Sequence, residues 1–186
     1  RIITFILTLL TLLGAFIIST VLYTYTKTYV FNGMYVHDQI ASLLKIIIYI
    51  VSAFAFVYAR EYIKERDIPE GEFYILGLFS VLGMMVLVSA NSLLVIFLGL
   101  ELTSLPQYTM IALHRKSSIC SEAAIKYFVL GATASAILLY GMSLLYGAAN
   151  SIDLLVIAKT VANLTPTHQY IAFFALVFLV VGVVFK

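Results

Sequence analysis

The chain has 186 residues, of which 63% are hydrophobic and 11% are charged, whereas about 25% of the residues in an ordinary soluble domain are charged. This composition excludes a water-soluble fold, because too few polar residues are present to cover the apolar ones, and it excludes a disordered chain. A single cysteine and a net charge of +2 exclude a disulfide scaffold, a cysteine-rich metal site and a nucleic-acid-binding protein. The remaining class is an integral membrane protein.

Six apolar segments follow one another, and each is close to the length of about 20 residues with which a helix spans the hydrocarbon core. They run over about residues 2–22, 41–59, 73–89, 93–113, 121–146 and 169–186. The runs are continuous rather than alternating, so they predict a polytopic all-α transmembrane helix bundle and not a β-barrel. We treat residues 1–186 as a single bundle. Because the chain starts at Arg1 and ends inside an apolar run, we expect it to be a piece of a longer protein.

Polar stretches connect the segments. Residues 23–38 form a polar, aromatic connection, and residues 60–72 mix charges of both signs with proline and glycine, which predicts an aqueous loop. Ser121 is predicted to cap the fifth segment, with Glu122 in its first turn. Residues 151–161 are predicted to form a short interfacial helix.

Three ionisable residues lie inside the apolar segments. Glu101 is about halfway through the fourth, Lys126 is two turns into the fifth, and Lys186 follows a long apolar run in the sixth. A charged side chain near the bilayer centre costs roughly 2.5–3.5 kcal/mol on insertion scales, so such residues face a protein interior or a wet cavity and commonly mark a transport path. Lys45 lies near the start of the second segment, from where it can snorkel to the interface.

Glu101 and Lys126 lie on antiparallel neighbours, at depths that differ by roughly 10 Å along the helix axis. A direct ion pair, a water bridge and a purely structural pair all remain open. Pro106 offers a local distortion, because it removes the backbone hydrogen bond to the carbonyl group of Leu102. If the residues carry protons instead, a nearby carboxylate raises the pKa of the lysine. Movement of that carboxylate can then cause the lysine to take up or release its proton.

Other polar residues give weaker signals. His37, His114 and His168 are predicted to lie in solvated loops, without the spacing of a helical cluster. The small-residue run 131–136 is explained by close helix packing. The sequence has no glycine-rich nucleotide motif, cysteine cluster or pair of intramembrane histidines, so we expect no NAD, flavin, iron–sulfur or haem site in this chain.

Four motifs resemble a known family. Leu98–Tyr108 resembles the glutamate-bearing helix of subunit N of proton-pumping NADH:quinone oxidoreductase (respiratory complex I), one of its antiporter-like subunits. Ser121–Ala132 resembles the following helix, which bears a lysine, and Leu138–Gly147 continues it. Gly182–Lys186 resembles the start of the family's broken helix, where a lysine lies at the discontinuity.

This resemblance implies an antiporter-like subunit fold, with the chain supplying roughly helices two to seven and its last four segments forming part of the first inverted repeat. It implies that Glu101, Lys126 and Lys186 belong to a proton path coupled to quinone reduction elsewhere in the complex. It places NAD, FMN, iron–sulfur and quinone sites in other subunits. The implied partners are membrane lipids and neighbouring antiporter-like subunits, without nucleic acid, in the bacterial inner (plasma) or the mitochondrial inner membrane.

Two other classes remain open. The chain could belong to a related sodium/proton antiporter or membrane hydrogenase, for which sodium-dependent transport in vesicles would be diagnostic. It could also be a purely structural membrane subunit in which Glu101 and Lys126 form a static pair. In that case, replacing both residues by apolar ones would leave transport unchanged.

Overall fold

The computed structural model describes residues 2–23, 27–115, 117–163 and 165–186. Within these ranges, six helices are long and apolar enough to cross a membrane, which confirms the predicted all-α integral membrane bundle. The helices are α1 (Ile2–Val21), α2 (Gln39–Glu65), α3 (Glu70–Val88), α4 (Leu93–Ile111), α5 (Ser118–Ala149), α6 (Leu154–Val161) and α7 (Pro166–Phe185). Of these, α6 is the short helix that does not reach the length of a span.

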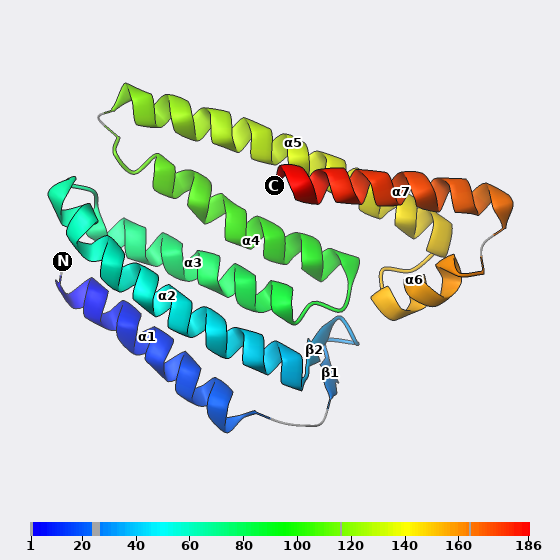
Figure 1. Ribbon diagram of the computed structural model, residues 1–186, viewed down its shortest axis with the longest axis horizontal. Coiled ribbons are helices and arrows are strands. Elements are labelled where there is room, and N and C mark those ends of the chain that lie inside the picture. Colours follow the sequence, from blue (N-terminus) through cyan, green and yellow to red (C-terminus); the bar gives the residue numbers. More distant parts are fainter. Residues whose placement is uncertain (1, 24–26, 116, 164) are drawn as a thin grey trace.

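The long helices lie side by side, with α1 at one edge and α5 and α7 at the other (Figure 1). Helices α1, α2 and α3 share one apolar core, which is built around Phe56 and Tyr74. A second core joins α4, α5 and α6 through Leu93, Leu138 and Ile157. Helix α7 turns back along α5, so that its C-terminal end lies beside the middle of that helix (Figure 1). This return brings three helices together around the candidate site.

The connection between α1 and α2 contains a β-hairpin that the sequence analysis described only as polar and aromatic. Strands β1 (Thr28–Val30) and β2 (Tyr35–His37) pair antiparallel, and Val30 faces Tyr35 in the register. The hairpin lies against the turn between α3 and α4, where the Val36 amide donates to the Ser89 carbonyl at 2.8 Å and the Asn91 amide donates to the Met34 carbonyl at 2.9 Å. Strands of three residues are too short to leave an alternating pattern in a sequence.

Several helices extend beyond the predicted segments, among them α3, which begins at Glu70, and α7, which begins at Pro166. Two of the differences have a clear local cause. Helix α2 continues to Glu65, because residues 60–65 include good helix formers and the side chain of Ile63 is fully buried. Helix α5 begins at Ser118 instead of after Ser121, because the hydroxyl group of Ser117 accepts the hydrogen bond of the Cys120 amide at 3.3 Å and caps the helix one turn earlier.

The histidine prediction also changes, because His37 belongs to β2 and His168 lies in the first turn of α7. By contrast, the predicted short helix near residues 151–161 is present as α6. Asp153 caps it by accepting the Leu155 amide at 2.8 Å.

Two glycines allow α5 and α7 to approach closely. A Cβ atom added at Gly182 would lie 2.8 Å from the backbone nitrogen and Cα of Leu138, and one added at Gly141 would lie 2.9 Å from the backbone nitrogen of Leu179. Backbone atoms cannot move aside as a flexible side chain can. The position of Lys186, one turn beyond Gly182, therefore depends on the absence of a side chain at this glycine.

Gly182→Leu is expected to destabilise the bundle by about 1–3 kcal/mol, because overpacking forces two backbones apart. The measurement is the midpoint temperature of thermal unfolding of the purified full-length protein. Gly14→Leu on α1 is the matched control, because a Cβ atom there meets nothing within 4 Å. Equal midpoints for Gly182→Leu and the wild type would contradict this account of α5–α7 packing.

Candidate functional site

Glu101 lies near the middle of α4, which begins after Ser92, whose hydroxyl group accepts the Val95 amide at 3.3 Å. The hydroxyl groups beside Glu101 are already used by the helix itself. Thr103 donates to the Gly99 carbonyl at 2.8 Å and Ser104 donates to the Leu100 carbonyl at 2.7 Å. These two hydroxyl groups therefore do not donate to Glu101, and its partners come from other helices.

Glu101 forms an ion pair with Lys186 at the end of α7, and it accepts a hydrogen bond from the hydroxyl group of Ser135 on α5. The Lys186 ammonium also donates to the Ser135 oxygen at 2.8 Å. We call these three residues the charge cluster. The side chain of Lys186 is 6% exposed and that of Glu101 is 21% exposed, so the cluster is largely enclosed by α4, α5 and α7.

This geometry makes proton transfer within the charge cluster chemically simple. Taking a carboxylate and an ammonium group out of water is costly, and their attraction offsets this cost only while they remain together. A proton moved from Lys186 Nζ to Glu101 Oε1 would leave two neutral groups. The Ser135 hydroxyl can serve the same transfer, because its oxygen accepts a proton from the ammonium while its own proton passes to the carboxylate.

Lys126 lies apart from the charge cluster. Its ammonium group pairs with Glu122, one turn earlier on α5, at 2.5 Å, and the two side chains are 70% and 66% exposed. Nine residues separate Lys126 from Ser135, which is about 14 Å along a helix. Lys126 and Glu101, both in the described part of the chain, therefore do not form a direct ion pair. Glu122 was predicted to lie in the first turn of the fifth segment, but α5 begins at Ser118, so Glu122 lies in the second turn.

Ser135 is the residue that sequence reasoning missed, because the run 131–136 was explained by packing alone. A signal was present in the helical spacing. Gly131, Ser135, Leu138 and Met142 recur at the interval that puts them on one face of a helix, and all four are buried. A hydroxyl group on a packed face of small residues points toward a neighbouring helix, where it needs a partner.

Polar contacts continue between α3 and α4 on the far side of the site. The Ser80 hydroxyl donates to the Thr103 carbonyl at 3.2 Å, and the Gln107 amide donates to the Ser80 oxygen at 3.5 Å. Pro106 is buried, and α4 continues through it as one helix. Among the described residues, no group of three or more His, Cys, Asp or Glu side chains is arranged to hold a metal ion.

Residues 90–186 match the family described as NADH:quinone oxidoreductase/Mrp antiporter, TM. The chain belongs to this family. The match begins at the turn before α4 and contains all three residues of the charge cluster. Membership in this antiporter family confirms the resemblance on which the predicted fold depended.

Curated relatives of this antiporter-family chain carry the name NADH-quinone oxidoreductase subunit N. The protein from Coxiella burnetii is 51% identical over 97% of this chain and 38% of its own length. That from Nitrosomonas europaea is 48% identical over the whole chain and 38% of its own length. The chain thus spans about two fifths of these relatives.

Solved structures show the same fold. Respiratory complex I from Thermus thermophilus with bound aureothin contains a chain that matches with a TM-score of 0.75 and 30% identity, over 96% of this chain and 37% of that one. The archaeal membrane-bound sulfane sulfur reductase matches with a TM-score of 0.81 at 21% identity, over 94% of this chain and 37% of that one. The second likeness concerns the fold alone.

Proposed function

We propose that this chain is part of a proton-translocating membrane subunit of NADH-quinone oxidoreductase. The observation that carries the proposal is the enclosed Glu101–Lys186 pair with its bridging Ser135 hydroxyl. Charged groups inside a membrane bundle are costly and are commonly found on ion or proton paths. The subunit N relatives supply the identity of the complex.

In the proposed mechanism, the charge cluster has a closed and an open state. In the closed state, the Glu101 carboxylate and the Lys186 ammonium group form their ion pair. A change in charge elsewhere in the complex separates the pair, and because an isolated ammonium group is costly in an enclosed site, the proton passes from Lys186 Nζ to Glu101 Oε1 as the groups part and leaves both of them neutral. While the two groups are together, the Ser135 hydroxyl contacts both of them and offers a second route for the proton.

The oxidation of NADH and the reduction of quinone are assigned to other subunits of the complex. NAD, FMN, iron–sulfur clusters and quinone would bind there, and this chain would contribute no redox chemistry of its own. Neighbouring antiporter-like subunits and membrane lipids are the proposed partners. Coupling would then be electrostatic, through a row of three intramembrane charges formed by Glu101, Lys126 and Lys186.

Lys126→Ala in the full-length, assembled protein is expected to lower proton pumping severalfold, because it removes a charge from this row. The measurement is proton uptake by vesicles during NADH oxidation, divided by the amount of assembled complex. The exposed pair with Glu122 contributes at most about 0.5 kcal/mol to folding, so assembly should stay normal.

Lys159→Ala is the matched control, because Lys159 lies in the last turn of α6, away from the row. Normal pumping by Lys126→Ala at a normal amount of complex would remove Lys126 from the path. Proton uptake that depends on the sodium concentration would instead favour the sodium/proton antiporter alternative over the complex I assignment.

A further inference from the structure

Lys45 is a second buried cation, and the proposed function does not use it. The sequence predicted that its side chain would snorkel to the interface, but the residue is only 8% exposed. Its ammonium group donates to the Tyr35 hydroxyl at 2.8 Å and lies 5.0 Å from the centre of the Tyr35 ring. Within the described ranges, no carboxylate pairs with it, although an ammonium group has three hydrogens to donate.

The Lys45 side chain lines a cavity of about 220 Å³ between α1, α2 and the hairpin. We call it the head cavity. Its other polar lining residues are Ser19, Tyr35, His37, Ser42 and Tyr49. The nearest acid along the chain, Asp38, caps α2 by accepting the Ala41 amide at 2.8 Å.

Two of the polar groups in the head cavity are held in place by the backbone. His37 Nε2 donates to the Leu22 carbonyl at 3.2 Å, and the Ser42 hydroxyl donates to the Asp38 carbonyl at 2.9 Å. Burial raises the pKa of Tyr35, but the nearby Lys45 ammonium and Ser89 hydroxyl outweigh burial and hold that pKa below its ordinary value. The described residues that line the head cavity include the Lys45 ammonium group and no carboxylate, so the cavity has the chemistry of an anion site.

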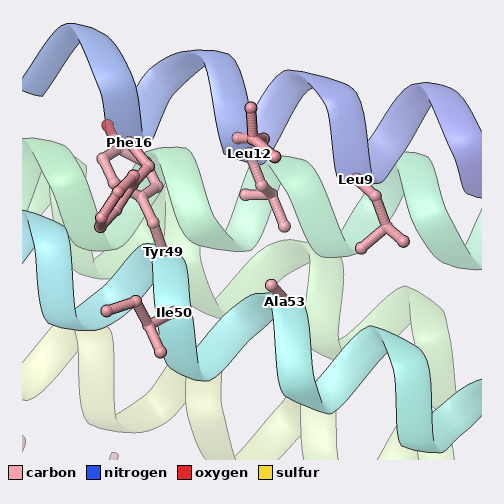
Figure 2. Close-up of a pocket in the computed structure, with 7 residues that line it drawn as sticks. Leu9, Leu12, Phe16, Tyr49, Ile50 and Ala53 are labelled. Atoms are coloured by element: carbon pink, nitrogen blue, oxygen red, sulfur yellow. The ribbon is translucent and has the colours of Figure 1, made fainter.

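An apolar groove of about 310 Å³ lies between α1 and α2. Figure 2 shows Leu9, Leu12 and Phe16 of α1 facing Ile50 and Ala53 of α2 across it. Tyr49 lines both spaces. Lys45, Tyr49 and Ala53 follow one another at intervals of four residues, so they lie on one face of α2 over about 12 Å.

We propose that the head cavity and the groove together bind one anionic phospholipid. Its phosphate group would accept hydrogen bonds from Lys45, and one acyl chain would lie in the groove toward Leu9. A cation at one end and apolar walls at the other match the chemistry of such a lipid.

The depth of Lys45 in the bilayer agrees with a phospholipid as the occupant. Lys45 is six residues, or about 9 Å, from the start of α2, at the hairpin end of the bundle. A lipid phosphate group lies just outside the hydrocarbon core, within reach of an extended lysine at this depth. Helix α1 is at the edge of the described bundle (Figure 1), and the groove lies between it and α2.

The test uses the full-length protein in its assembled complex, in phosphatidylcholine vesicles that contain phosphatidylglycerol with a photoreactive group in its acyl chain. After illumination, labelled peptides are identified by mass spectrometry. We expect labels on the segments that contain Leu13 and Ile50. A photoreactive phosphatidylcholine should label them less, because it carries no net charge.

Lys45→Met is expected to lower this labelling about tenfold or more, because it removes hydrogen bonds to a charged group. Lys45→Arg should retain it, and Lys27→Met is the control, because Lys27 is an exposed lysine in the connection between α1 and α2. Ala53→Phe should also lower labelling, by filling the groove while keeping Lys45. This second variant gives an answer even where Lys45→Met fails to assemble.

Three outcomes would overturn the proposal. The first is equal labelling of the wild type and Lys45→Met. The second is the absence of labels in the wild-type groove, which would mean that another protein segment covers it. The third is protection of Lys45 from chemical modification by inorganic phosphate without any groove labelling, which would assign the head cavity to a free anion.

Discussion

Glu101→Gln and Lys186→Met are each expected to lower proton pumping about tenfold or more and to reduce the stability of the assembled protein. Each variant leaves one charge of an enclosed pair without its counter-charge. Removing one partner of a fully buried pair costs about 3–5 kcal/mol, and the 21% exposure of Glu101 places this site toward the lower end. Pumping falls because the proton carrier, or the group that holds it charged, is missing.

The measurements are proton uptake per NADH oxidised and the midpoint temperature of thermal unfolding, both at a known amount of complex. Glu72→Gln is the control, because Glu72 pairs with Arg115 in an ion pair whose side chains are 47% and 73% exposed. Such a surface ion pair contributes little to the free energy of unfolding. Wild-type pumping by either cluster variant would remove that residue from the path.

Ser135→Ala is expected to slow proton pumping severalfold while the complex assembles normally. The substitution keeps the small size that α5 needs for packing, but it removes one hydrogen bond to Glu101 and one from Lys186. The Glu101–Lys186 ion pair remains in this variant, so neither charge loses its counter-charge. If the hydroxyl group carries the proton between the two residues, its loss affects the rate more than the stability.

Ser143→Ala on the same helix is the matched control. The Ser143 hydroxyl donates to the Tyr140 carbonyl of its own helix at 2.8 Å, on an exposed face. We expect this variant to pump like the wild type. Equal rates for Ser135→Ala and Ser143→Ala would show that Ser135 only packs, and the proposed bridge would have to be a direct transfer or a water molecule.

Much of the fold follows from local sequence, because a helix that spans a bilayer must be apolar over most of its length. The helical segments and the short helix α6 were therefore predictable. The β-hairpin was not, because its hydrogen bonds to Ser89 and Asn91 join residues that are far apart in the sequence. The N-terminus of α5 was misplaced because both Ser117 and Ser121 are good capping residues, and local sequence does not choose between them.

The candidate site was predictable as a set of residues but not as a geometry. Glu101 and Lys186 were identified because charges inside apolar segments are rare. Their pairing depends on the return of α7 to α5, which Gly141 and Gly182 permit through backbone contacts over long sequence distances. Ser135 was hidden for a related reason, since a serine among small residues is explained by packing until a partner is known.

The same limit applies to Lys45. Its place near the start of an apolar segment suggested an ammonium group at the interface. The hairpin, which local sequence did not predict, closes over it and supplies the Tyr35 hydroxyl. Burial of this lysine is thus a consequence of tertiary structure, and the proposed lipid site follows from that burial and from the groove beside it.

The most direct test of the central claim is proton uptake per NADH oxidised by the double variant Glu101→Gln/Lys186→Met. Removing both charges leaves no uncompensated ion, so stability should recover relative to the single variants. If the charge cluster carries protons, pumping by the double variant remains at least about tenfold below the wild type although the complex is stable. Wild-type pumping by a stable double variant would instead show that Glu101 and Lys186 form a static structural pair.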